Sequence, residues 1–270
     1  MIGPSMGDAL LSLRSSDATE AHRRRSFTDE DIAGMTGARA VFDALTAAVA
    51  SHRIGHDVPV RVALDGLSAD EHRLVEEVLG EGEVLVKLPG EVRVQESVMA
   101  GIWRVADPAT GARWLEVADI PSVVRGAVCD LPSEIKVPAE DRIPRGAINV
   151  RPVLGELRDH AADRADDPAA HQPHEVNLTL LPMTSIDLMV LETALNGDGP
   201  VDILSRGYGN CRVVSTGIRN VWRLMYFNAD DKMILHVLQV GDVPAAALAA
   251  QEDLADTAER LSEILGAYYT

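Results

Sequence analysis

The chain has 270 residues and repeats part of its own sequence, and this repeat constrains the fold more than any other feature. At a constant offset of 119 positions, five identities line up: Gly90 with Gly209, Arg93 with Arg212, Val94 with Val213, Trp103 with Trp222 and Arg104 with Arg223. Beyond them the offset becomes 123, and the matching pairs are Val117 with Val240, Asp119 with Asp242 and Pro121 with Pro244. The four additional residues fall in the turn-forming segment 227–232. The sequence therefore predicts an internal duplication.

The elements of the first copy follow from its apolar pattern. Val41, Leu45 and Val49 share one helical face, which predicts a helix over 38–52. The run 58–64 has strand length, and Ser68 with Glu71 three residues later is a capping box that predicts a helix to Leu79. Four short runs then predict a strand meander, over 83–88, 91–98, 101–106 and 112–117. A further helix is expected after Ile120 and Pro121.

The same order returns in the second copy, with a helix over 152–160, a strand over 176–181 and a helix over 184–195. Each copy is thus a helix-strand-helix-meander-helix unit. Such a unit suits an antiparallel sheet that is covered by helices on one face. We therefore expect an α+β fold of two tandem copies, with antiparallel sheets covered by helices and a pseudo-twofold relation between them.

Composition shifts suggest the domain boundaries. We expect a mobile tail over 1–36, a first repeat over 37–135, a connecting helix over 136–160, an acidic linker over 161–173 and a second repeat over 174–270. The tail contains 24–27 (RRSF), which resembles the core of a twin-arginine export signal. Acidic residues follow at 29–31, where such a signal needs an apolar stretch, so we do not interpret it as one.

The composition narrows the class of protein. The 42 acidic and 25 basic residues give a formal charge of -17, which disfavours nucleic acid as a partner. The acidic surface either attracts basic partners or only maintains solubility. Cys129 and Cys211 are too few for a disulfide framework or a four-ligand metal site, and no apolar run is long enough for a membrane span. We expect a cytoplasmic protein without a cofactor or metal of its own.

The segment 205–212 (SRGYGNCR) carries the candidate site. Arginine forks and an aromatic ring stand beside glycines that let a peptide backbone approach, which favours binding of a partner chain. The first copy keeps the matching glycine and arginine but lacks the tyrosine, asparagine and cysteine, and this difference points to function in the second copy. The predicted partner-binding residues are Arg206, Tyr208, Asn210, Cys211 and Arg212.

Structural explanations remain open for each of these residues. The glycines could form only a bulge, and the arginines could pair with nearby carboxylates. Cys211 is either a reactive thiol or a small buried apolar group. A hydrolase or transferase built on Cys211 and His236 would need thiol and imidazole within roughly 3 to 4 Å of each other.

Other conspicuous residues favour structural roles. Trp103 and Trp222 occupy equivalent positions, which is typical of a core or of an interface between repeats. The histidines at 160, 171 and 174 span a proline-containing segment without helical spacing, so we expect a solvated loop there and no metal site. The chain has neither a nucleophile elbow nor a nucleotide-binding glycine loop, and we do not expect an enzyme.

The segment 205–212, followed by 215–216 (ST), 220–222 (NVW) and 226–228 (YFN) and preceded by 174–182 (HEVNLTLLP), resembles the C-terminal region of the HupH/HyaF family of nickel-iron hydrogenase maturation proteins. Gln239 and Arg223 depart from the family pattern. The resemblance implies a chaperone-like binding protein that assists hydrogenase assembly. It implies binding of the iron-sulfur small-subunit precursor before export, alongside a thioredoxin-like maturation chaperone. The alternative is an iron-sulfur cluster or cofactor carrier that uses Cys211 at an interface.

Overall fold

One ten-stranded antiparallel sheet runs through the middle of the molecule, in the strand order β1-β5-β4-β3-β2-β7-β8-β9-β10-β6. The computed structural model describes residues 27–166, 172–207 and 209–269. The strands are β1 Val60–Ala63, β2 Val84–Lys87, β3 Arg93–Glu96, β4 Ile102–Asp107, β5 Ala112–Val117, β6 His174–Asn177, β7 Asp198–Ser205, β8 Asn210–Thr216, β9 Val221–Phe227 and β10 Met233–Val240. In the described ranges no helix is long and apolar enough to cross a membrane.

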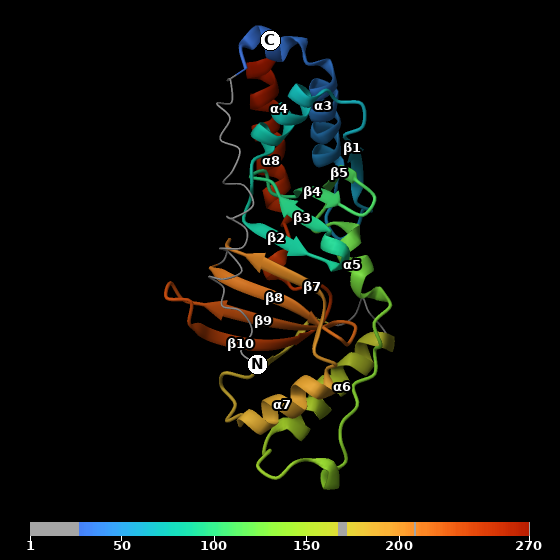
Figure 1. Cartoon of the computed structure of the whole chain (residues 1–270), viewed down its shortest axis with the longest axis vertical. Helices are drawn as coiled ribbons and strands as arrows, with labels where there is room; N and C mark the ends of the chain where they lie inside the picture. Colours follow the sequence, from blue (N-terminus) through green and yellow to red (C-terminus); the bar gives the residue numbers. More distant parts are fainter. Residues whose placement is uncertain (1–26, 167–171, 208, 270) are drawn as a thin grey trace.

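Helices gather at the two ends of this elongated sheet (Figure 1). In the described chain the seven α-helices are α2 Asp29–Gly34, α3 Thr36–Ser51, α4 Ala69–Leu79, α5 Ser122–Cys129, α6 Val150–Asp166, α7 Ser185–Ala194 and α8 Gln251–Tyr268. Short 3-10 turns are η1 Pro89–Glu91, η2 Glu140–Arg142 and η3 Ala245–Ala247. Figure 1 shows α3, α4 and α8 at one end, α6 and α7 at the other, and α5 beside the middle. The α+β class is confirmed.

The expectation of separate sheets is wrong, because β2 pairs with β7 and joins all ten strands. Helices also cover both faces of the sheet, where we expected one. Because neighbouring residues of a strand point to opposite faces, the sheet has a tryptophan face, with Val94, Trp103, Cys211 and Trp222, and an arginine face, with Arg93, Arg104, Arg212 and Arg223.

Each face carries its own core. On the tryptophan face, α5 and η3 pack over the central strands around Trp103 and Trp222, both of which are buried as expected. On the arginine face, α3, α4 and α8 form a core at one end, and α6 and α7 form another at the far end. Helix α8 comes from the end of the chain, yet its Leu254 and Leu261 lie in the same core as Phe42 of α3.

Several element boundaries differ from the sequence predictions. Helix α2 begins after Thr28, whose side chain caps it, so this part of the predicted tail is helical. Residues 136–149 contain only η2, and α6 runs from Val150 to Asp166, through the first six residues of the predicted linker. Strand β6 ends at Asn177, because the Asn177 side chain accepts the N–H groups of the next turn. Residues 1–26 and 167–171 lie outside the described part.

The two halves of the sheet use the same register around their tryptophans. Trp103 lies opposite Glu96 and Glu116, and Trp222 lies opposite Ser215 and Gln239. Glu96 and Ser215 are 119 positions apart, and Glu116 and Gln239 are 123 positions apart, which are the two offsets of the sequence identities. Each indole N–H also donates to a backbone carbonyl at the equivalent position, of Ala118 at 3.0 Å and of Gly241 at 3.3 Å.

A capping carboxylate ties two helices together in each half. Glu71 caps α4 and also accepts the N–H groups of Gly37 and Ala38 at the start of α3. Asp187 caps α7 and accepts N–H groups at the start of α6, from Ile148, Asn149 and Val150. Burial by itself raises the pKa of Asp187, but the hydrogen bonds from Thr184, Val150 and Ile148 outweigh it and hold this pKa at about 2.

Replacing Asp187 by Ala is expected to lower the free energy of unfolding by about 1 to 3 kcal/mol, since buried N–H groups lose a charged acceptor. The folded-state pKa lies below the ordinary value, so the carboxylate contributes fully above about pH 4, and its contribution is lost as the pH falls toward 2. Urea unfolding at neutral pH measures the loss. The control Asp159→Ala removes an exposed aspartate of α6, and an equal loss there would contradict the assignment.

Burial raises the pKa of Glu96 to about 7, and the nearby charges of Asp253 and Glu83 add to this effect. The unfolded chain then ionises at lower pH than the folded one, so stability is lost as the pH rises from about 4.5 to 7 and stays low above it. We expect Glu96→Gln to stabilise the protein by about 1 kcal/mol more at pH 8 than at pH 6. Urea unfolding at the two pH values tests this, and Glu81→Gln, at an exposed position, should show no such difference.

Candidate functional site

The predicted site lies at the hairpin between β7 and β8, at one edge of the junction between the two halves of the sheet. The N–H of Arg206 donates to the carbonyl of Glu83, just before β2, and the Arg206 side chain is exposed. Gly209 has a φ of 94°, a conformation that residues with a side chain rarely adopt. The positive φ in this turn therefore explains why the segment has a glycine at position 209. Tyr208 lies outside the described residues.

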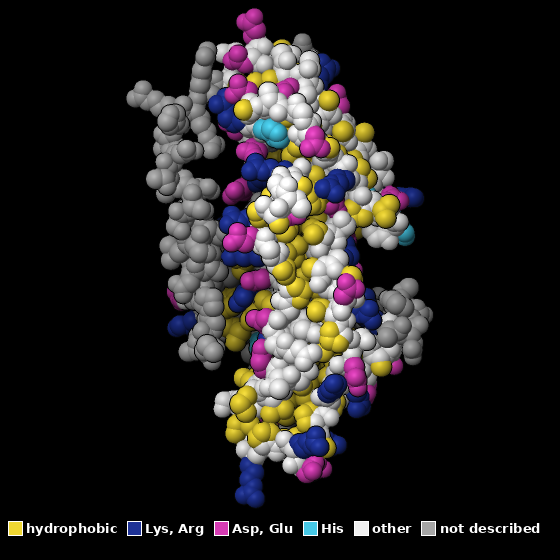
Figure 2. All heavy atoms as spheres, turned by 45° about the vertical axis from the view of Figure 1, so that its right-hand side comes forward, with side chains coloured by type: hydrophobic (Ala, Val, Ile, Leu, Met, Phe, Trp, Pro, Cys, Tyr) yellow, Lys and Arg dark blue, Asp and Glu magenta, His cyan; other side chains and the backbone are white. Residues whose placement is uncertain are grey.

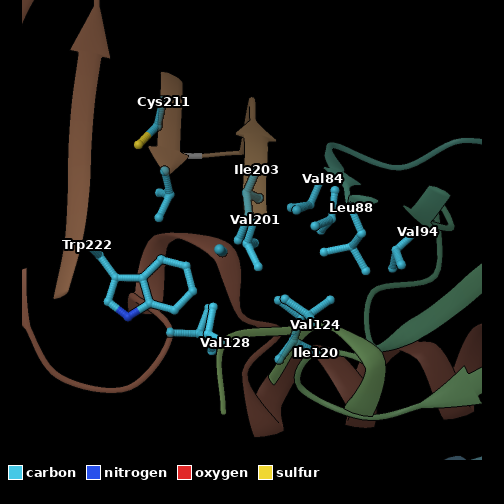
Figure 3. Packing of buried hydrophobic residues seen from close by; sticks show 14 of the residues in the cluster. Val84, Leu88, Val94, Ile120, Val124, Val128, Val201, Ile203, Cys211 and Trp222 are labelled. Carbon is cyan, nitrogen blue, oxygen red and sulfur yellow. The ribbon is translucent and has the colours of Figure 1, made fainter. Parts of the chain in front are cut away.

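Cys211 lies on the tryptophan face and has no exposed surface. Figure 3 shows its side chain on the side of the sheet that also carries Trp222, Ile203 and Val201. Burial raises the pKa of its thiol to about 11, although a hydrogen bond with Tyr226 acts in the opposite direction. The thiol therefore stays protonated at neutral pH and packs as a small apolar group.

Arg212, the next residue, points to the arginine face and forms a fork with Asp202. Its Nε lies 2.9 Å from one carboxylate oxygen and a terminal nitrogen lies 3.1 Å from the other. Asn210 is half-buried and, by strand alternation, lies on this same face. The sheet thus separates Cys211 from Asn210 and Arg212, and the five predicted residues do not form one site. Their role in partner binding stays a prediction.

The thiol and imidazole of the proposed hydrolase do not meet. His236 lies opposite Met225 in the strand pairing, whereas Cys211 lies opposite Tyr226, so the two side chains are on opposite faces of the sheet. His236 is half-buried, and this burial together with the charge of Arg223 lowers its pKa. The hypothesis of a hydrolase built on these two residues is wrong.

Two of the three histidines come together in a way that the sequence did not indicate. The rings of His160 and His174 stack with centroids 3.5 Å apart, and His174 Nε2 lies 2.7 Å from a carboxylate oxygen of Glu156. His171 lies outside the described residues. Within the ranges that the structure describes, no three His, Cys, Asp or Glu side chains are placed to hold a metal ion. The pair joins the end of α6 to the start of β6.

The two arginines at the equivalent positions 104 and 223 have different surroundings, which sequence reasoning missed. Arg223 is nearly buried and contacts Glu192 at 2.6 Å and Asp198 at 2.7 Å. Arg104 is half-buried, forms no ion pair with any described residue, and its Nε is buried without a hydrogen-bond partner. The shared offset identified both positions, but only the tertiary contacts distinguish them.

Charges of both signs mix on the surface despite the acidic total. On the face that Figure 2 presents, Lys and Arg side chains are interspersed with Asp and Glu side chains. Screening limits the reach of each exposed charge to about 8 Å at physiological ionic strength. A partner therefore meets local groups of side chains, and the total charge of -17 does not by itself define what binds.

The burial of Cys211 leads to a reactivity test. In the folded protein we expect a thiol reagent such as DTNB to modify the exposed Cys129 quickly and Cys211 only after denaturation. Cys129→Ser should therefore remove the fast phase and leave the slow one intact. Fast modification of Cys211 in the folded Cys129→Ser protein would contradict a buried thiol.

Comparison with known proteins agrees with the resemblance and covers both halves of the chain. The family model described as the HupH hydrogenase expression protein, C-terminal conserved region, matches residues 35–141 and residues 147–268. The hydrogenase expression/formation protein HoxQ of Azotobacter vinelandii is 41% identical over 239 residues, which cover 86% of this chain and 82% of that protein.

Two further relatives carry similar names. The hydrogenase expression/formation protein HupH of Rhizobium leguminosarum bv. viciae is 44% identical over 209 residues, covering 74% of this chain and 71% of its own. The hydrogenase-1 operon protein HyaF of Escherichia coli (strain K12) is 33% identical over 210 residues, covering 75% and 71%. The description of the family names no catalytic activity. The chain belongs to the HupH/HoxQ/HyaF family of hydrogenase expression/formation proteins.

Proposed function

We propose that this protein is a chaperone-like binding protein that assists the assembly of a nickel-iron hydrogenase by holding its iron-sulfur small-subunit precursor before export. Membership of a family named for hydrogenase expression and formation carries this proposal. A thioredoxin-like maturation chaperone is proposed as a companion protein, as the family resemblance implies. The protein itself acts by binding.

The surface around the predicted segment supports a binding role. Asn210 lies opposite Phe227, and Phe227 lies opposite Met233, so the β7–β8 and β9–β10 hairpins end side by side (Figure 1). Met233 and Ile234 are 53% and 57% exposed, and they lie at the same end of strands β7 to β10 as the exposed Arg206 and the half-buried Asn210. We call Arg206, Asn210, Phe227, Met233 and Ile234 the hairpin surface. Apolar side chains beside hydrogen-bond donors suit contact with another protein chain.

The alternative role as a cluster or cofactor carrier has little support. It needs Cys211 as a ligand, and the Cys211 thiol has no exposed area and a raised pKa. A cluster ligand must be a thiolate that the cluster can reach. Strand β8 would have to leave the sheet before Cys211 could serve, so we retain the binding role.

We also propose that the two halves descend from one duplicated unit. The strand order reads alike from both ends, with β1 and β6 at equivalent edges. The tryptophan hydrogen bonds and the two helix-tying carboxylates recur at matching places. One family model matches both 35–141 and 147–268. These correspondences support the predicted repeat.

A pull-down tests the proposed function. The tagged protein is recovered from hydrogenase-producing cells without oxygen, and immunoblots for both hydrogenase subunits measure what it retains. We expect the small-subunit precursor to be retained. The double variant Arg206→Glu with Met233→Asp should retain at least about tenfold less, because it reverses a charge and places a carboxylate on apolar contact area.

Arg158→Glu, on the exposed surface of α6, is the matched control and should retain as much precursor as the unchanged protein. Circular dichroism verifies that each variant is folded. Retention of the large subunit alone would refute the choice of partner. Equal retention by the double variant would refute the hairpin surface as the binding site.

A further inference from the structure

Two neighbouring rows of side chains cross the middle of the arginine face, and we call them the central basic rows. Both follow from the strand pairing across β5, β4, β3, β2, β7 and β8. The first row is Arg113, Ala106, Arg93, Lys87, Asp202 and Val214. The second row is Leu115, Arg104, Gln95, Leu85, Leu204 and Arg212. The rows hold five cations and one carboxylate, in a protein whose formal charge is -17.

The cations of these rows are poorly compensated. Asp202 is engaged by Arg212, and the other four cations form no ion pair with a described residue. Lys87 lies directly opposite Arg93 on the neighbouring strand. Like charges placed opposite each other across two strands destabilise a sheet. An arrangement that costs stability and lacks internal partners points to an external anion.

Arg104 and Arg223, which occupy equivalent positions, differ in their charged neighbours. Arg223 forms ion pairs with two carboxylates, whereas Arg104 forms none with a described residue. Each guanidinium has one buried nitrogen without a hydrogen bond, but Nη2 of Arg223 lies 2.6 Å from Glu192 and Nε of Arg104 has no such carboxylate. A buried donor without a partner costs free energy unless a ligand supplies the acceptor. A carboxylate is well matched to the planar fork of a guanidinium.

The rows can be reached from outside the molecule. Arg93 and Arg113 are exposed, and Lys87 and Arg104 are half-buried. On this face the helices contact mainly the outer strands, α3 against β1 and β5 and α6 against β6 and β10. Helix α5 and η3 contact β7 as part of the core on the tryptophan face. The basic side chains thus stand over the middle of the sheet, between the two helical ends.

We propose that the central basic rows bind an extended, carboxylate-rich segment of a protein partner, with Arg104 as the anchor. The proposal rests on the proposed function in one respect, because it names the chemistry of the partner segment that such an assembly factor binds. A long polyanion such as nucleic acid would meet the repulsion of the acidic total charge, whereas a short peptide needs only the local side chains. The rows adjoin the hairpin surface through Arg212 and Asn210, so one partner chain can contact both.

Fluorescence anisotropy with a labelled oligoglutamate peptide tests the proposal on the full chain. We expect saturable binding that weakens at least tenfold when NaCl is raised from about 0.1 to about 1 M. Arg104→Gln combined with Arg93→Gln should weaken binding about tenfold or more, since it removes two charge-assisted pairs. In the absence of peptide this variant should unfold at the same or higher urea concentration, because Arg104 loses no internal partner. The equivalent Arg223→Gln should unfold earlier.

Two control variants separate the rows from other basic groups. Arg158→Gln removes an exposed arginine of α6, and the triple replacement of Arg23, Arg24 and Arg25 by Ala removes the basic cluster near the start of the chain. Both should bind the peptide with unchanged affinity. The proposal is overturned if either control weakens binding as much as the double variant, if an oligolysine peptide binds as well, or if single-stranded oligothymidylate displaces the peptide and binds more tightly.

The peptide assay tests the central basic rows and the pull-down tests the proposed function, so their failures can be told apart. If the protein binds oligoglutamate through Arg93 and Arg104 but retains no hydrogenase precursor, the central basic rows remain a carboxylate-binding site. The proposed small-subunit partner is then refuted. If the protein does not bind oligoglutamate, and replacing Arg93 and Arg104 leaves precursor retention unchanged, only the proposal for the central basic rows is overturned.

Discussion

The pairing of β2 with β7 is the contact on which the rest of the structure depends. Four residue pairs join the strands, from Val84 opposite Ser205 to Lys87 opposite Asp202. Without them, each half would end in an unpaired strand edge, which is prone to pair with other chains. The junction also places Val86 and Ile203, both fully buried, in a core that both halves share. The halves therefore fold as one sheet with one central core, and the crossing contacts of α8 strengthen this connection.

Strand alternation, imposed by that sheet, determines which residues can act together. Cys211 and Arg212 are neighbours in the sequence, yet one packs beside Trp222 and the other pairs with Asp202 on the opposite face. A site that uses both side chains would require the strand to twist out of its hydrogen bonds. The same rule aligns Arg93 and Arg104, from different strands, on one face with Arg212. Side chains that lie together on one face therefore come from neighbouring strands, and those of Cys211 and Arg212 are divided between the two faces.

The tertiary structure also determines where charges of each sign gather. The formal charge of -17 is a sum over the whole chain, but the middle of the arginine face is locally basic because its two central rows hold five cations and one carboxylate, Asp202. Asp187 and Glu71 are used inside the structure, where they tie helix starts together. Asp198 and Glu192 neutralise Arg223, and the equivalent Arg104 has no such partner. Binding to a protein such as this depends on local pairing of charges more than on their sum.

The sequence by itself determined most of the helices and strands, the capping box at Ser68, the burial of both tryptophans and the matching residues 119 positions apart. Those features depend on local spacing, on helix-capping chemistry and on apolar periodicity, which can be recognised from short stretches of sequence. Only the tertiary structure decided that β2 meets β7, that α8 returns to the first half and that Cys211 is buried while Arg104 lacks a partner. These outcomes depend on contacts between distant residues, and no local pattern specifies which strands pair or which carboxylate reaches which arginine.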